Sequence, residues 1–141
     1  MAIKQLSVFV ENRRGRLTTL TGIIAEHNID FRTTVIAETS DFGILRCIVE
    51  DPENAAKILN ENGFTASLST VTPVVIPDKP GAVHNVLKLL SSADIDVKYM
   101  YSSITRTNQE IIIILKTSDT EKTEEILSDH YYKICTLEDL K

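Results

Sequence analysis

Two short loops at equivalent positions of a sequence repeat, with an offset of 66 (81 − 15), contain the residues best suited to bind a small charged molecule. The first reads Asn12-Arg-Arg-Gly-Arg-Leu17 and the second Asp78-Lys-Pro-Gly-Ala-Val83. Each loop follows an apolar run and precedes a segment with helical periodicity, so its glycine is expected at the start of a helix. Unpaired N–H groups and the positive end of the helix dipole attract a carboxylate there. Glycine has no Cβ, which lets a ligand approach the backbone closely.

A small molecule that carries both a carboxylate and an ammonium group would also need an acceptor for the ammonium. Asn12 and Asp78 open the two loops, and each could hold the loop, accept from the ammonium or simply cap the helix. Asp30 and Asp96 stand at matching strand entries, and each precedes a basic residue by two positions. Each of these aspartates could hold the ammonium, or could form a solvated surface pair with its basic neighbour.

The candidate ligand-binding residues belong to the two loops and the two strand entries. They are Asn12, Arg14, Gly15, Arg16, Leu17, Asp30, Asp78, Pro80, Gly81, Ala82, Val83 and Asp96.

No set of residues typical of catalysis accompanies the loops. The histidines His27, His84 and His130 are scattered, and no acidic residue or cysteine stands near them at metal-ligand spacing. Neither Gly-x-Gly-x-x-Gly nor Gly-x-Ser-x-Gly occurs. Cys47 and Cys135 share no close spacing, so we expect buried free thiols. The sequence thus predicts a protein that is not an enzyme and uses neither a metal nor another cofactor.

The loops belong to a repeat that covers the chain. The offset of 66 continues without a gap to the pair Ile48 and Ile114, and it becomes 68 only in the last helix. A unit of this size is a small domain rather than a solenoid repeat. We therefore expect two domains, at residues 1–70 and 71–141, packed side by side with a ligand site between them.

Each repeat shows the same order of expected elements. First strands are expected at 3–10 and 71–77, and a helix follows each loop. Alternation then predicts second strands, the first of which has Phe31, Thr33 and Val35 on one side together with Ile29.

Third strands, second helices and short fourth strands complete each repeat. The second helices begin at Asp51 and, through a capping box, at Ser118, and the fourth strands are expected near 64–70 and 132–138. The order βαββαβ, present twice, predicts an α+β protein of two ferredoxin-like domains, each with an antiparallel sheet and helices on one face.

Apolar residues on the helix-free side of these sheets need cover. Phe9, Ile36, Ile112 and Ile114 are predicted to point to that side. Either the twin domain or a second chain must cover them, so a homo-oligomer, at least a dimer, is expected.

The loop sequences and the element order resemble the ACT domain. In that family Asp/Asn-x-Pro-Gly-x-Leu/Val opens the first helix, which Asp78-Lys-Pro-Gly-Ala-Val83 matches, and Ala93-Asp-Ile-Asp-Val97 resembles its strand entry. In the first copy Arg14 replaces the proline. The resemblance implies a regulatory module that binds a free amino acid at an interface between paired domains and acts on a partner such as a metabolic enzyme.

Charge and hydropathy exclude other partners. A net charge of −5 argues against a nucleic-acid-binding protein, and the longest apolar run, 111–115, is too short to span a membrane. The first residues contain no apolar signal core, which predicts a cytoplasmic location.

Two alternatives remain beside the amino-acid sensor. One is a ligand-free interaction subunit of a metabolic enzyme. The other is an acylphosphatase-like hydrolase, because that family shares the ferredoxin-like fold and holds phosphate in a loop at this place, where this chain has Arg13, Arg14 and Arg16.

Overall fold

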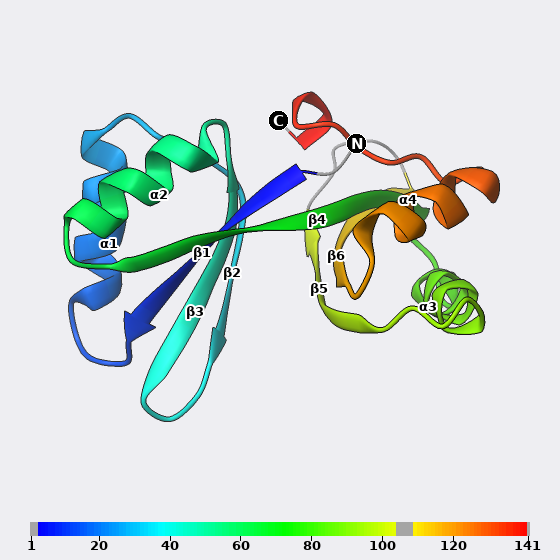
Figure 1. The fold of residues 1–141 in the computed structure, drawn as a ribbon, viewed down its shortest axis with the longest axis horizontal. Coiled ribbons are helices and arrows are strands. Elements are labelled where there is room, and N and C mark those ends of the chain that lie inside the picture. Colours follow the sequence, from blue (N-terminus) through cyan, green and yellow to red (C-terminus); the bar gives the residue numbers. More distant parts are fainter. Residues whose placement is uncertain (1–2, 104–108, 141) are drawn as a thin grey trace. The chain divides into compact units, whose positions relative to one another are not determined.

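The computed structural model describes residues 3–103 and 109–140 and divides the chain into two compact units (Figure 1). One unit comprises Lys4–Ser69 and the other continues from Thr70. We call them the first and the second repeat and describe each by itself.

The first repeat is an antiparallel sheet with two helices. Its strands are hydrogen-bonded in the order β2-β3-β1-β4. The elements are β1 (Ile3–Glu11), α1 (Arg16–Glu26), β2 (Phe31–Glu38), β3 (Phe42–Val49), α2 (Pro52–Glu61) and the beginning of β4 (Thr65–Pro77).

The second repeat uses the same plan. Its sheet order is β4-β6-β5. After β4 come α3 (Ala82–Ser92), β5 (Val97–Ser103), β6 (Glu110–Thr117), α4 (Thr120–Asp129) and a short 3₁₀ helix, η1 (Glu138–Leu140). The predicted fold, two ferredoxin-like repeats with antiparallel sheets, is confirmed.

The fourth strands differ from the prediction in both repeats. The expected strands at 64–70 and 71–77 form one continuous strand, β4, that serves both repeats. Within the described residues, the segment 132–138 forms no strand; it contributes a single bridge between Val74 and Ile134.

Helices cover one face of the first sheet. The core there combines alternate residues of β1 and β3 with the inward side of both helices, and its buried members are Leu6, Val8, Val10, Leu20, Ile24, Leu45, Cys47, Val49, Ala55, Leu59 and Phe64. In Figure 1, α1 and α2 lie together beside the strands of this repeat.

A β-bulge at the start of β2 changes the predicted side-chain pattern. The register shifts between Phe31 and Thr33, so one extra residue is inserted there. Phe31 packs against the helix-side core, whereas Thr33 and Val35 lie on the other face. The prediction that these three share one side with Ile29 is wrong, because an inserted residue reverses an alternation of period two. β5 has the same irregularity.

The bulge also decides where Ile36 points. Ile36 is opposite Leu45, so it lies on the helix side, and the prediction of the helix-free side is wrong for this residue. Phe9, Ile112 and Ile114 do lie on the helix-free faces, because their strand neighbours belong to the helix-side cores.

The offset between the repeats changes earlier than predicted. Strand pairing makes Leu45 equivalent to Ile113 (113 − 45 = 68), whereas β2 and β5 still correspond at the offset of 66. Ile48 and Ile114 are therefore not equivalent. The two additional residues lie between the second and third strands, where a change by two keeps every side chain on its face.

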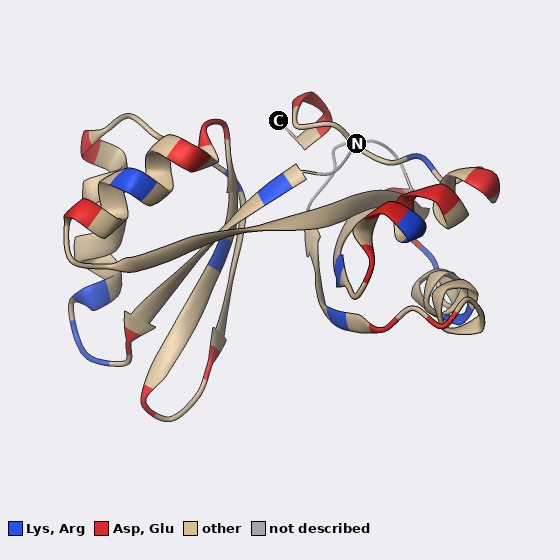
Figure 2. Cartoon of the chain, viewed as in Figure 1, with Lys and Arg blue, Asp and Glu red and all other residues tan. Residues whose placement is uncertain are grey.

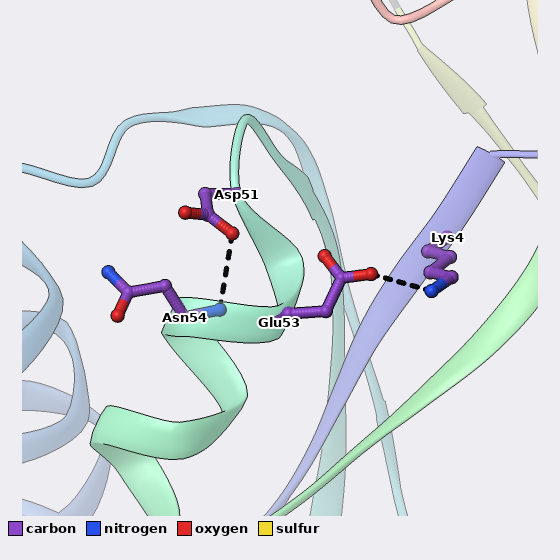
Figure 3. A network of polar contacts seen from close by, with 4 residues as sticks. All are labelled: Lys4, Asp51, Glu53 and Asn54. Atoms are coloured by element: carbon purple, nitrogen blue, oxygen red, sulfur yellow. Dashed lines mark hydrogen bonds and ion pairs between the residues drawn. The ribbon is translucent and has the colours of Figure 1, made fainter.

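The start of α2 agrees with the sequence. Asp51 is the N-cap, and its carboxylate accepts from the Asn54 N–H at 3.2 Å (Figure 3). Two residues after this cap, the Glu53 carboxylate accepts a hydrogen bond from Lys4 Nζ of β1 at 2.6 Å. This bond lowers the pKa of the Glu53 carboxyl.

The start of α4 differs from the prediction. Asp119, not Ser118, is the N-cap and accepts from the Lys122 N–H at 3.0 Å. The Ser118 hydroxyl instead accepts a hydrogen bond from the Asp96 N–H at 3.1 Å, at the entry to β5, and is therefore not the cap of α4.

Candidate functional site

The two glycine loops have nearly the same backbone. Gly15 and Gly81 are the N-caps of α1 and α3, with φ of 87° and 89°. A Cβ built at either position would meet no described atom within 4 Å. The left-handed backbone therefore requires glycine, and the space beside it is open.

Asn12 holds the first loop in place. Its Nδ2 donates to the Ser40 carbonyl at 3.3 Å, and its N–H donates to the Asp41 carbonyl at 3.0 Å. Asn12 thus joins the loop to the β2–β3 turn and does not cap α1. The Asp78 N–H makes the corresponding contact to the Gln109 carbonyl at 2.7 Å.

The three arginines of the first loop do not converge. Arg13 Nε lies 3.1 Å from Glu11 Oε2, while the Arg16 guanidinium lies 4.3 Å above the Phe64 ring. Arg14 is exposed, and no ion pair to it occurs in the described residues. A convergent phosphate cradle of the acylphosphatase kind is therefore not formed by Arg13 and Arg16.

A cavity of about 190 Å³ lies beside this loop. It is lined by the loop, the end of β1 and the β2–β3 hairpin, through Val10, Glu11, Asn12, Arg13, Leu17, Ile36, Glu38 and Gly43. Figure 2 shows basic residues in the β1–α1 loop and acidic residues at the neighbouring strand ends. Among the described residues, the Glu38 carboxylate has no hydrogen-bond or ion-pair partner, so it is available to a cationic group.

Gly43 lines this cavity at a place where the neighbouring strand leaves little room for a side chain. A Cβ on Gly43 would lie 3.3 Å from Ile36 Cγ2 and 3.4 Å from the Ala37 carbonyl oxygen. Both contacts are tight, so a larger residue would push Ile36 or the edge strand.

A second, larger cavity of about 400 Å³ continues from the first along α1 and β2. Its walls are Leu17, Thr21, Phe31, Thr34, Val35, Ile36 and Leu45. Leu17 and Ile36 line both cavities, so we call the two together the α1–β2 groove. One end of the groove is polar and the other is apolar.

Among the described residues of the second repeat, the place that corresponds to the apolar cavity is closed. Strand pairing and the offset of 66 make Thr21 equivalent to Leu87 and Thr34 equivalent to Met100. Both larger side chains line the corresponding place, where the free volume is about 0 Å³. The two predicted loops therefore differ in the open space behind them, which is present in the first repeat and filled by side chains in the second.

The aspartates at the strand entries lie elsewhere. Asp30 precedes β2, whereas the first loop lies near its far end, at Glu38. The eight residues of β2 span about 25 Å at about 3.3 Å per residue. One amino acid cannot reach both ends, so within the first repeat Asp30 is not brought together with Asn12. Asp96 is exposed, and its backbone pairs with Ser118.

The predicted residues of the second loop fall into two kinds. Asp78, Pro80 and Gly81 are exposed, whereas Ala82 is buried and Val83 is half-buried against the core of the second repeat. Ala82 stands where the first repeat has Arg16.

The site contains residues that the sequence interpretation did not select. They are Glu38 and Gly43 at the polar end and Phe31, Thr34, Ile36 and Thr21 at the apolar end. A signal for two of them was present, since the repeat alignment sets Thr21 against Leu87 and Thr34 against Met100.

Metal-binding and membrane-spanning features do not occur in the described ranges 3–103 and 109–140. These ranges contain no cluster of three metal-ligating side chains, and none of their helices is long and apolar enough to cross a membrane. Cys47 and Cys135 are buried free thiols, and burial raises the pKa of Cys47 to about 12.

The fold is that of a known family. The model of the ACT domain pair matches residues 1–141, and the chain belongs to this family. No match is found among curated protein sequences.

Solved structures agree with the family. Protein BT0572 from Bacteroides thetaiotaomicron is 38% identical, with a TM-score of 0.90 over 99% of this chain and 96% of that one. The regulatory subunits of aspartate kinase from Thermus thermophilus (ligand-free form) and Thermus flavus are 14% and 13% identical. Their TM-scores are 0.67 and 0.64, over 91% of this chain and 90% and 92% of theirs, which shows a shared fold.

Proposed function

We propose that the chain is a regulatory protein that binds a free amino acid in the α1–β2 groove of the first repeat and acts on a partner protein in trans. The observation that carries this proposal is the polar cavity lined by Asn12 and Leu17 that continues into an apolar one. Regulatory subunits of aspartate kinase share the fold, which supports a regulatory role and a metabolic enzyme as partner.

The polar end suits both charges of an amino acid. The Glu38 carboxylate lines the cavity and is available to an ammonium group. The N–H groups in the first turn of α1 lack intrahelical partners and favour a carboxylate, as does the positive end of the helix dipole. Glu38 and Leu17 of the first turn of α1 line the same cavity, so a single amino acid there would have an acceptor for its ammonium and donors for its carboxylate.

The second loop enters the proposal in a smaller role. Its backbone could hold a carboxylate in the same way, but the place beside it is filled by Leu87 and Met100. We therefore assign the ligand to the first loop. Asp30 and Asp96 are left outside the groove's polar end.

A thermal-shift screen of the twenty amino acids tests the proposal. A ligand at a hundredfold excess over its Kd stabilises the protein by about 2.7 kcal/mol. For a chain of 141 residues this raises Tm by about 5 to 10 °C. Glu38→Gln should reduce the shift, because it removes the acceptor for the ammonium, whereas Glu61→Gln on the exposed side of α2 should leave it unchanged.

The same screen decides between the amino-acid sensor and the ligand-free interaction subunit. If no amino acid at millimolar concentration moves Tm, the ligand-free interaction subunit replaces the sensor. The acylphosphatase-like alternative is tested by acyl phosphate hydrolysis, for which the divergent Arg13 and Arg16 give no support.

A further inference from the structure

We infer that the ligand is an amino acid with a large apolar side chain, branched aliphatic or aromatic, and that only the first repeat binds it. This inference rests on the proposed function, because it assumes that an amino acid occupies the groove. It adds the class of side chain and the number of sites per chain.

The volume of the groove argues for a large side chain. The apolar part measures about 400 Å³, twice the polar cavity of about 190 Å³. It lies within the range of about 300 to 1,000 Å³ that small-molecule sites occupy. A glycine, alanine or serine held at the polar end would leave the apolar part unfilled.

The walls argue for an apolar side chain. No charged residue lines the apolar part of the groove. Its threonine at position 21 already donates its hydroxyl hydrogen within α1, with Oγ1 at 3.0 Å from the Leu17 carbonyl and 3.1 Å from the Thr18 carbonyl. A charged side chain would therefore lose water without gaining an oppositely charged partner, which costs binding free energy.

Two exposed apolar residues at the groove offer a contact surface to the side chain of a ligand. Leu17 is 39% exposed and Ile36 is 46% exposed, and both stand at the junction of its polar and apolar ends. The junction places the side chain of a bound amino acid against Leu17 and Ile36 once its ammonium group is held beside Glu38.

In the second repeat, the described residues leave no open space at the place of the apolar cavity. Leu87 and Met100 occupy the places of Thr21 and Thr34, and the corresponding space has no free volume. The two repeats have the same glycine backbone at the loop, so the difference lies in the side chains of the groove. This restricts the apolar ligand to the first repeat, at one site per chain.

The first experiment compares Kd values of leucine, phenylalanine, alanine, serine, aspartate and lysine for the full chain by isothermal titration calorimetry. Each buried CH₂ group contributes about 0.8 kcal/mol, or about fourfold in Kd. Leucine or phenylalanine should bind at least about tenfold more tightly than alanine, at one site per chain. Tighter binding of serine, aspartate or lysine would overturn this inference and leave the proposed function intact, and binding of none of the six, with none in the thermal-shift screen, would overturn the proposed function itself.

The second experiment fills the groove with the residue that the second repeat uses. Thr21→Leu should weaken leucine or phenylalanine binding at least about tenfold and should affect alanine less. Thr18→Leu is the matched control, because Thr18 is exposed on the same helix and does not line the groove. Unchanged leucine and phenylalanine binding in Thr21→Leu would overturn the placement of the side chain.

The third measurement tests a second copy of the chain as the occupant. Sedimentation velocity of the parent chain and Thr21→Leu should give the same oligomeric state, because the groove is assigned to a small ligand. A loss of association in Thr21→Leu alone would show that the groove holds a neighbouring chain and would overturn the inference.

Discussion

The two repeats have equivalent cores and equivalent loops but different grooves. Gly15 and Gly81 start their helices with φ values of 87° and 89°, and each glycine carbonyl accepts from the N–H four residues later. Between the first helix and the second strand, however, one repeat has two threonines and an open groove, and the other has leucine and methionine and no free volume. The fold is therefore compatible with both states, and a few side chains decide between them.

The difference extends to the residue after each glycine. Arg16 reaches over the Phe64 ring at 4.3 Å, whereas its counterpart Ala82 is buried in the core of the second repeat. A cation above an aromatic ring contributes about 0.5 to 1 kcal/mol at an exposed site. The first repeat thus has a half-buried cation over a buried aromatic ring where the second has a small apolar residue in its core.

The largest expected effect tests the equivalence of the two cores. Ile24 of α1 and Leu90 of α3 are equivalent, similar in size and almost fully buried. Ile24→Ala and Leu90→Ala should each lower the free energy of unfolding by about 3 to 4 kcal/mol, because each removes the same apolar volume from a closed core. Urea denaturation measures both values.

The outcome for these two variants sharpens the comparison. Equal losses would show that the open groove leaves the core of the first repeat as tightly packed as that of the second. Truncating a well-packed isoleucine or leucine to alanine costs at least about 2 kcal/mol. If Ile24→Ala falls below that value while Leu90→Ala does not, the groove loosens the first core, and the repeats differ throughout.

The next effect comes from exchanging the groove residues between the repeats. Leu87→Thr should destabilise the chain by about 1 to 2 kcal/mol, because it removes half-buried apolar surface and lowers helix propensity. Thr21→Leu should stabilise the ligand-free chain by about 1 kcal/mol, because it fills open apolar space. Thermal denaturation of both variants measures these changes.

Thr18→Leu separates packing from helix propensity in this exchange. It changes the same residue types on the same helix at an exposed position, so it should gain only about 0.4 kcal/mol. If Thr21→Leu stabilises no more than Thr18→Leu, the groove is not an unfilled apolar space, and the contrast between the repeats fails.

The element order could be predicted from the sequence because it depends on local patterns. The repeat placed both loops at their helices, and Gly15 and Gly81 marked the two helix starts correctly. Asp51 was recognised as a cap from its position before proline. These signals are contained within a few neighbouring residues, so no tertiary contact is needed to find them.

The side-chain directions in the second strands could not be predicted in the same way. A bulge after Phe31 depends on how β2 pairs with β3, and alternation alone does not show it. The error moved Ile36 to the wrong face and thereby hid the groove. Likewise Ser118 fits a capping box locally, but its hydroxyl is engaged by Asp96, a residue distant in sequence.

Only the polar end of the candidate site could be predicted from the sequence. The polar end follows from the loop Asn12–Leu17, whose chemistry is visible in the sequence. The apolar end needs Thr21 and Thr34 on separate elements to face one space, which requires the register of β2. Comparing the two repeats position by position would have shown small residues opposite Leu87 and Met100.

The smallest expected effect concerns an ion pair that only the first repeat has. Lys4 Nζ donates to Glu53 Oε1 at 2.6 Å, whereas the equivalent positions in the second repeat are Thr70 and Glu121 (Figure 3). The bond to Lys4 lowers the pKa of Glu53 in the folded chain below its ordinary value.

A carboxyl group with a lowered folded-state pKa stabilises the fold above its unfolded-state pKa, and the contribution disappears as the pH falls through the folded-state pKa. Glu53→Gln should therefore lower Tm slightly at pH 7 and by less at about pH 3, and Glu121→Gln should lower Tm less at pH 7, because Thr70 stands where the first repeat has Lys4. Because both carboxylates are on the surface, the difference should also shrink in about 1 M salt. Thermal denaturation of the two variants at both pH values measures it, and an equal pH dependence for both would remove this ion pair as a difference between the repeats.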